Sequence, residues 1–305
     1  MSPTLPALSL QGQNLDLAES AFGEIRNSEA FLGDVEALRD RLNEDGYLYI
    51  RNFFPTELIV TARAALCSRL AERGLIDRNF PEIDAVMAPG AASAVWSTLP
   101  GQDPAIERVV FGPELEGFYT ELLGGTIRHY DHIWTRGIGR GLGTAPHCDK
   151  VYMGRGTSNL LTCWIPYGDV PLEQGGLVVL EKSHHKAGLL APYLARDVDK
   201  YCENRPDEVA AAQAGKFHWG GELTKNPVTL REKLGGTRWL TAEWRAGDFL
   251  TFKINLVHGG LDNHTDRIRL STDTRYQRAS EPIDERWIGE KPIGHSSAAK
   301  RGRIC

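Results

Sequence analysis

Two segments organise this sequence: Ala145-Pro146-His147-Cys148-Asp149-Lys150 and, much later in the chain, Val257-His258-Gly259-Gly260. Two imidazoles and one carboxylate form the ligand set of a non-haem iron(II) site, which leaves the opposite face of the metal open. On an extended strand, residues i and i+2 point the same way, so His147 and Asp149 are expected to face one metal. His258 is expected to supply the third ligand from a distant part of the fold.

A second His-x-Asp pattern has to be weighed against the first. His258 follows the apolar segment Phe249-Leu250-Thr251-Phe252, so we expect it near the end of a strand. The other pattern, His264-Thr265-Asp266, follows a run of turn-forming residues. We therefore interpret it as a solvated loop and not as a pair of ligands.

The composition is that of a soluble globular protein. Of the 305 residues, 41% are hydrophobic and 25% are charged, and the formal net charge of -5 disfavours nucleic acid as a partner. No apolar run is long enough to span a bilayer, which disfavours a membrane protein. The five cysteines are scattered and form no C-x-x-C pair, which fits a reducing, intracellular setting and a cytoplasmic location.

Helical patterns dominate the first part of the chain. Residues 1–32 show no sustained period and are expected to form a loosely attached N-terminal arm. Apolar residues at helical spacing predict a helix that begins after Gly33 and ends at Gly46. A proline at the first helical position predicts two more helices, one from Pro55 to about Arg73 and one from Asp103 to Leu123.

Strand patterns dominate the second part. Segments with strand-like composition lie between Gly, Pro and Asp turns at 126–135, 146–153, 158–166, 176–181, 238–244, 248–255 and 268–278. Helices followed by many short strands predict an α+β chain with a mainly β core, folded as a double-sheet jelly roll. We expect one domain over 33–305, with a helical front at 33–125 and the jelly-roll core at 126–280.

The strand rhythm breaks over residues 184–236, which carry charge clusters, prolines and aromatic residues. A long insertion between core strands is often a lid or a binding loop. The alternative is a surface excursion that only covers the edge of a sheet.

The order and spacing of several motifs resemble one known family. They are Asp45-Gly46-Tyr47, Asn52-Phe53-Phe54, His147-Cys148-Asp149, Trp164-Ile165-Pro166, Gly175-Gly176-Leu177-Val178-Val179-Leu180, Ser183-His184, Gly247-Asp248, His258-Gly259 and Arg269-Leu270-Ser271. Over most of residues 33–280 the chain resembles the phytanoyl-CoA dioxygenase family of iron(II)/2-oxoglutarate oxygenases. The resemblance implies a double-stranded β-helix fronted by helices, with His147, Asp149 and His258 as the iron ligands.

The resemblance also implies a 2-oxoglutarate site. Arg269 would grip the far carboxylate of 2-oxoglutarate, because a buried carboxylate needs a charged partner and a guanidinium can meet it with two parallel hydrogen bonds. Ser271 lies on the same strand face and would add a hydroxyl. Arg275 shares that face and is the rival for the role; otherwise it would face the substrate or an ion pair at the sheet edge. Trp164 either lines the cosubstrate pocket or belongs to the core.

The activity implied by the resemblance is hydroxylation of an unactivated C–H bond. Iron(II) would be the cofactor and 2-oxoglutarate and O2 the cosubstrates, with succinate and CO2 as coproducts and a small metabolite or natural-product intermediate as substrate. Halogenating relatives lack the carboxylate of Asp149, so hydroxylation, or a desaturase or cyclase variant of it, is favoured over halogenation. A catalytically silent jelly-roll binding protein and a cupin-type isomerase or hydrolase are the other classes, and neither needs Arg269 beside the three ligands. The oligomeric state, monomer or homodimer, is left open.

Cations near the first two ligands suggest an anionic substrate. The candidates are Arg128, Arg136, Arg140, Lys150 and Arg155. A solvated basic strand edge is the alternative for this cluster. Trp134 is expected to form either an aromatic wall of the pocket or part of the core.

Overall fold

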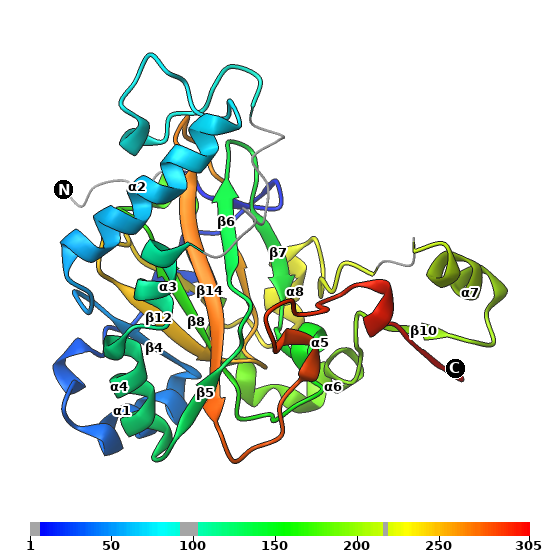
Figure 1. Ribbon diagram of the computed structural model, residues 1–305. Coiled ribbons are helices and arrows are strands. Elements are labelled where there is room, and N and C mark those ends of the chain that lie inside the picture. Colours follow the sequence, from blue (N-terminus) through cyan, green and yellow to red (C-terminus); the bar gives the residue numbers. More distant parts are fainter. Residues whose placement is uncertain (1–6, 92–102, 216–218) are drawn as a thin grey trace.

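Two β-sheets face each other in the computed structural model, which describes residues 7–91, 103–215 and 219–305 (Figure 1). The larger sheet has the order β4-β12-β8-β14-β5, with β6 also paired to β14: β4 (Tyr47–Ile50), β12 (Phe249–Lys253), β8 (Leu161–Pro166), β14 (Arg269–Arg278), β5 (Ile127–His129) and β6 (Trp134–Ile138). The smaller sheet has the order β3 (Phe22–Glu24), β11 (Trp239–Thr241), β9 (Leu177–Leu180), β13 (His258–Gly260) and β7 (Thr144–His147). The predicted jelly-roll class is confirmed, although the two sheets do not close into one barrel.

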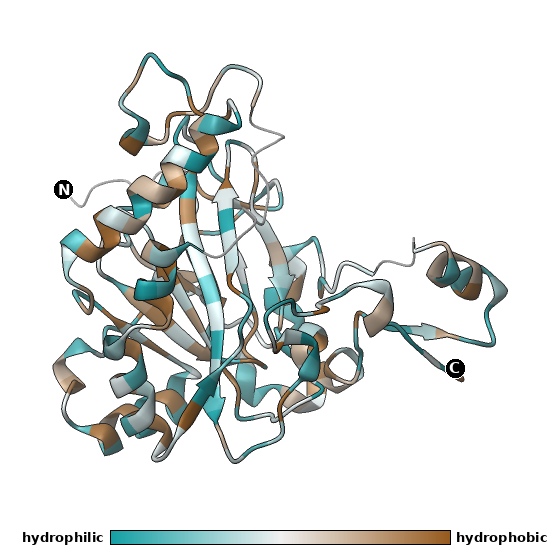
Figure 2. Cartoon of the chain, in the orientation of Figure 1, coloured by the Kyte–Doolittle hydropathy of each residue, from teal (hydrophilic) through white to brown (hydrophobic). Residues whose placement is uncertain are grey.

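Side chains along the strands of the larger sheet point alternately toward the covering helices and toward the space between the two sheets. On β8, Leu161, Cys163 and Ile165 pack against the helices, whereas Trp164 lies in the cluster between the sheets. Thr162 points to the same inner side and contacts the metal-ligand candidate Asp149. Along β14, strongly hydrophilic residues alternate with residues near the middle of the hydropathy scale (Figure 2). The period of two therefore places polar side chains in the interior and hydrocarbon beneath the helices.

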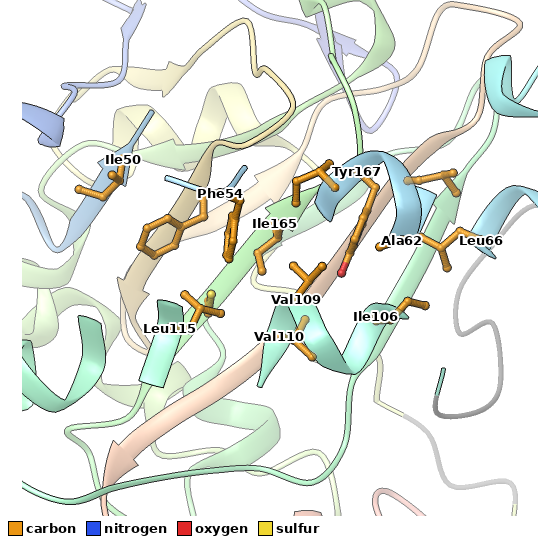
Figure 3. Packing of buried hydrophobic residues seen from close by; sticks show 14 of the residues in the cluster. Ile50, Phe54, Ala62, Leu66, Ile106, Val109, Val110, Leu115, Ile165 and Tyr167 are labelled. Carbon is orange, nitrogen blue, oxygen red and sulfur yellow. The ribbon is translucent and has the colours of Figure 1, made fainter. Parts of the chain in front are cut away.

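Four helices cover the outer face of the larger sheet: α1 (Val35–Asp45), α2 (Thr56–Glu72), α3 (Pro104–Val110) and α4 (Pro113–Leu123) (Figure 1). Figure 3 shows their packing, in which Val109 of α3 lies between Ile165 and Tyr167, and Ala62 of α2 lies beside Tyr167. A single helix over 103–123 was the expectation, and it is wrong. Gly112 is extended and is followed by a proline that lacks an N–H, so a new helix starts there. No helix in the described ranges is long and apolar enough to cross a membrane.

The N-terminal segment is part of the core, so the predicted loose arm is wrong for the residues that the structure describes from 7 onward. It forms the hairpin β1 (Ser9–Leu10) and β2 (Gln13–Asn14), and β3 then pairs in parallel with β11. Leu8 and Leu10 are buried against the outer face of the smaller sheet. The Ser9 hydroxyl also donates to Asp262, at 2.6 Å. Residues 1–6 lie outside the described part.

The insertion covers the same outer face. It contains α6 (Ala187–Leu194), β10 (Lys200–Cys202), α7 (Pro206–Gln213) and α8 (Pro227–Lys233), and its residues 216–218 lie outside the described part. Leu190 of α6 and Leu230 of α8 belong to the apolar cluster on the smaller sheet. By contrast, α7 and β10 project away from the two sheets (Figure 1).

Short 3-10 turns lie at Glu29–Phe31, Glu82–Asp84, Leu172–Gln174, Ser183–His185, Glu285–Trp287 and Ser297–Ala299.

The C-terminal segment is fastened to the insertion. The strand β15 (Arg301–Arg303) pairs in parallel with β10, and a disulfide joins Cys202 to Cys305, a pairing that the cysteine spacing did not indicate. The fully buried Asp199 carboxylate accepts hydrogen bonds from Lys300 at 2.6 Å and from Arg286, and it contacts the His295 ring at 2.8 Å. Burial alone would raise the pKa of Asp199, but these cationic partners lower it overall.

Candidate metal centre and cosubstrate site

The two histidines face each other across neighbouring strands. Antiparallel pairing of β13 with β7 places His258 directly opposite His147, with ring centroids 4.2 Å apart. The prediction that His258 lies near the end of the strand at 249–252 is wrong. That strand, β12, ends at Lys253, and the chain then crosses to the other sheet, where His258 begins β13. A cross-strand pair on one face holds the two rings close together.

Asp149 reaches the histidines from the turn before a short helix and not from a strand. The predicted strand over 146–153 is wrong after His147, because Asp149 has helical dihedral angles and precedes α5 (Lys150–Met153). Its Oδ1 atom nevertheless lies 3.7 Å from Nε2 of His147 and 3.7 Å from Nε2 of His258. The three ligand atoms all lie within 4.8 Å of one another, so they can hold one metal ion.

Backbone carbonyls fix the tautomer of both rings. Nδ1 of His147 lies 2.8 Å from the Ala145 carbonyl oxygen, and Nδ1 of His258 lies 3.1 Å from that of Leu256. A carbonyl only accepts, so Nδ1 carries the proton and the Nε2 lone pair is left for a metal. Burial lowers the pKa of His147 to about 3, and burial also lowers the pKa of His258. Both rings are therefore neutral at physiological pH, as metal binding requires.

The second carboxylate oxygen of Asp149, Oδ2, is fixed by hydrogen bonds from two side chains. It accepts hydrogen bonds from Arg275 at 2.7 Å and from the Thr162 hydroxyl at 2.5 Å. Arg275 also donates to Asp273 at 2.8 Å, and its guanidinium lies 4.2 Å from the ring centroid of Trp134. Burial would raise the pKa of Asp149, but the Arg275 guanidinium and the hydrogen bond from Thr162 help to lower it overall. The carboxylate is thus ionised and oriented, with Oδ1 left free.

The three ligand candidates line an inner cavity, and the guanidinium of Arg269, which has no ion pair in the described part of the chain, lines it too. Arg269 is 2% exposed, and neither its Nε nor the buried Ser271 hydroxyl has a hydrogen-bond partner in the described part of the chain. Burial lowers the pKa of Arg269 to about 9, which leaves it protonated at neutral pH. Trp164 lines this cavity, with its ring centroid 5.9 Å from the guanidinium, and also packs against Trp244. A buried guanidinium without an acid suits the far carboxylate of a dicarboxylate ligand.

A larger outer cavity of about 590 Å³ opens on the other side of the triad. His147, Asp149, Arg275 and Trp134 line it together with residues from three segments outside the core strands. Those residues are Gln11 of the N-terminal hairpin, Gly220, Glu222 and Lys225 of the insertion, and His295 of the C-terminal segment.

Most of the predicted basic cluster does not reach either cavity. Arg140 pairs with Asp266, and Lys150 contacts the Gly154 carbonyl at 3.5 Å. Arg155 donates to Asp197 at 2.7 Å. None of these three, nor Arg128, lines the inner or the outer cavity in the described chain, so neither cavity supports their assignment to a substrate pocket. The chain turns away from the cavities both before His147 and after Asp149. Basic residues that are close to these ligand candidates in the sequence are therefore not close to them in the fold.

Of the basic cluster, only Arg136 lines both cavities, and it pairs with Asp273 at 3.0 Å. The second His-x-Asp pattern lies away from the triad, as expected, because His264 contacts Ser9 and Asp266 is exposed.

Comparison with known proteins agrees with this geometry. Residues 42–271 match the phytanoyl-CoA dioxygenase (PhyH) family. The chain belongs to this family. EctD from S. alaskensis, solved with 2-oxoglutarate and 5-hydroxyectoine, shares the fold at 15% identity, with a TM-score of 0.57 over 99% of this chain and 97% of that one. The α-ketoglutarate-dependent epimerase SnoN from nogalamycin biosynthesis is 20% identical, with a TM-score of 0.53 over 86% of this chain and 93% of that one.

The carbocyclase SnoK from the same biosynthesis shares the fold at 17% identity, with a TM-score of 0.54 over 81% of this chain and 86% of that one. Membership of the family makes this chain an iron(II)- and 2-oxoglutarate-dependent oxygenase that acts on a small molecule.

Several side chains at the site were not found from the sequence. Thr162 lies opposite Arg275 and Asp273 lies opposite Trp164, all on the inward side, so strand parity alone could have identified them. Glu222 lies in the insertion, where no periodic pattern indicates which residues turn toward the cavity.

Proposed function

We propose that this protein hydroxylates an unactivated C–H bond of a small metabolite. His147, Asp149 and His258 would bind iron(II), and Arg269 with Ser271 would bind 2-oxoglutarate. The observation that carries the proposal is the buried Arg269 guanidinium, whose Nε has no hydrogen-bond partner among the described residues, in the cavity that the three ligand candidates also line. A cupin-type isomerase has no dicarboxylate to place there, whereas an oxygenase of this family does.

The chain's own contribution at the metal is orientation. The Ala145 and Leu256 carbonyls hold the protons of the two rings on Nδ1, so both Nε2 atoms are ready to bind without loss of a proton. Arg275 and Thr162 occupy Oδ2 of Asp149, which leaves Oδ1 as the metal-binding oxygen. When bound, iron(II) with 2-oxoglutarate activates O2 and supplies the oxidising chemistry.

At the cosubstrate end, the residues provide charge and shape. Arg269 would donate two parallel hydrogen bonds to the far carboxylate of 2-oxoglutarate, and Ser271 would add a third. Trp164 would form the wall beside them. This pairing removes the cost of an uncompensated buried guanidinium, so cosubstrate binding is expected to stabilise the fold.

The retained Asp149 favours hydroxylation over halogenation, because halogenating relatives lack this carboxylate. SnoN is an epimerase and SnoK a carbocyclase on the same fold, so product analysis has to separate hydroxylation from ring formation or desaturation. Incorporation of one atom of ¹⁸O from ¹⁸O2 into the product would identify hydroxylation, and its absence would identify one of the other outcomes.

The assignment is tested with iron(II), 2-oxoglutarate and O2. We expect succinate release, and we expect His147→Ala and Asp149→Ala to abolish it. His264→Ala is the matched control, because it alters the other His-x-Asp pattern and should retain activity. Metal-dependent turnover in Asp149→Ala that equals the unmodified protein would disprove the ligand assignment. A visible charge-transfer band on anaerobic addition of iron(II) and 2-oxoglutarate would show cosubstrate chelation before any substrate is known.

A further inference from the structure

One wall of the outer cavity is fastened directly to the loop that carries the metal ligands. The Tyr152 hydroxyl donates to the Gly220 carbonyl at 2.5 Å. The Tyr193 hydroxyl donates to the Gly221 carbonyl at 2.7 Å and accepts from the backbone N–H of Cys148 at 3.0 Å. Two tyrosines therefore tie the insertion to residues on either side of Asp149.

The backbone at this wall is also constrained in shape. Gly221 has a φ of +77°, and a Cβ there would lie 2.3 Å from the Tyr152 hydroxyl oxygen. The amide of Leu223 donates to the Pro146 carbonyl at 2.8 Å, one residue before the first ligand. Glu222 lies between these two anchored residues, so its backbone position relative to the triad is fixed.

The charges that line the outer cavity are mostly paired with one another. Arg136 pairs with Asp273, Arg275 pairs with Asp149 and Asp273, and the His295 ring contacts Asp199. Their charge is therefore already compensated inside the protein.

Two charged residues that line the outer cavity, Glu222 and Lys225, differ from these paired ones. Glu222 is half-buried and has no ion pair or hydrogen bond within the described ranges, and Lys225 is likewise unpaired there but exposed. A carboxylate that has lost part of its hydration without a partner is stabilised by a cation from outside, whereas an exposed lysine keeps its water.

We propose that Glu222 selects substrates that carry a cationic nitrogen, either a protonated amine or a quaternary ammonium group. The inference rests on the proposed function, since it takes the outer cavity as the substrate side of the metal centre. Trp134 and Tyr152 line the same cavity, and aromatic rings with a carboxylate are the usual surroundings of such a group. This reverses the polarity that the basic cluster suggested, because Arg140, Lys150 and Arg155 lie outside the cavity.

The test compares three probes of similar size on the anaerobic protein loaded with iron(II) and 2-oxoglutarate. They are benzyltrimethylammonium, benzyl alcohol and benzylsulfonate, and the cation has no lone pair with which to bind the metal. By isothermal titration calorimetry we expect the cation to bind at least about tenfold more tightly than the other two. Glu222→Gln should remove that preference, and the matched variant Lys225→Gln, which removes the opposite charge at the same cavity mouth, should keep it.

Three results would overturn the proposal. They are equal affinity for all three probes, no binding of the cation, and tighter binding of benzylsulfonate that is lost in Lys225→Gln. Thermal unfolding of both variants would show that they are folded. The charge-transfer band formed before any probe is added reports on the proposed function separately: a normal band without cation preference refutes only the role of Glu222. Cation binding without the band refutes only the oxygenase assignment.

Discussion

Arg275 compensates the buried Asp149 carboxylate, so we expect Arg275→Met to destabilise the protein even without metal. The two side chains are 2% and 3% exposed and lie 2.7 Å apart. Removing one partner of such a buried pair costs about 3–5 kcal/mol, because the remaining charge has no substitute for water. Asp273, the other acceptor of Arg275, keeps Arg136, so the loss falls mainly on Asp149.

The same substitution should weaken metal binding. Without Arg275, only the Thr162 hydroxyl orients Oδ2 of Asp149, and loss of such a supporting contact typically lowers metal affinity about 10- to 100-fold. Urea unfolding of the metal-free protein measures the first effect, and cobalt(II) titration followed by its visible spectrum measures the second.

Arg136→Met is the control for both measurements, because Arg136 bonds to Asp273 and not to Asp149. It should leave the cobalt(II) affinity within about threefold of the unmodified protein. Unchanged unfolding and unchanged affinity in Arg275→Met, or an equal loss of affinity in Arg136→Met, would refute the role given to Arg275.

Three further predictions concern the cosubstrate pocket and the fold. Arg269→Gln should raise the concentration of 2-oxoglutarate needed for half-maximal charge-transfer absorbance about 10- to 100-fold without changing cobalt(II) affinity; equal loss of both would contradict a cosubstrate role. Asp199 has a lowered pKa, so its contribution to stability is present above the unfolded-state pKa of about 3.9 and is lost as the pH falls further; Asp199→Asn should lower the unfolding free energy at pH 7 by about 3–5 kcal/mol and flatten the acid limb of the stability profile. Gly46→Ala should cost more than Gly33→Ala in urea unfolding, since both have positive φ but only a Cβ at Gly46 would meet the His184 ring, at 2.5 Å; equal costs would disprove the steric argument.

Local patterns predicted the elements that fold by local rules. The helix from Val35 to Asp45 ends where Gly46 adopts a φ of +80°, as a glycine after an apolar helical stripe indicates. The inner face of β14 follows directly from parity, which placed Arg269, Ser271 and Arg275 on one side. Parity did not predict which of the two guanidinium groups pairs with a carboxylate, because that depends on Asp149, which reaches Arg275 from the turn after β7.

Errors in the sequence-based expectations arose where tertiary contacts decide the structure. The strand expected to continue past His147 ends there, because α5 begins after Asp149. The N-terminal residues have no periodic pattern, yet Leu8 and Leu10 are buried because the smaller sheet has an apolar outer face to cover. Neither outcome has a local signal, since the partner surface is assembled from residues far along the chain.

Different parts of the chain supply the residues on the metal side of the centre and on the proposed substrate side. The core strands supply the two histidine ligand candidates and the turn after β7 supplies Asp149, and the charges of Asp149, Asp273 and Arg275 are paired with one another. A charge on the substrate therefore has to be met by segments added to the core. Those segments are the N-terminal hairpin, the insertion and the C-terminal segment, which bring Gln11, Glu222 and His295 to the cavity. If the proposals for the site hold, the core would determine the reaction, and the segments around it would select the molecule that is oxidised.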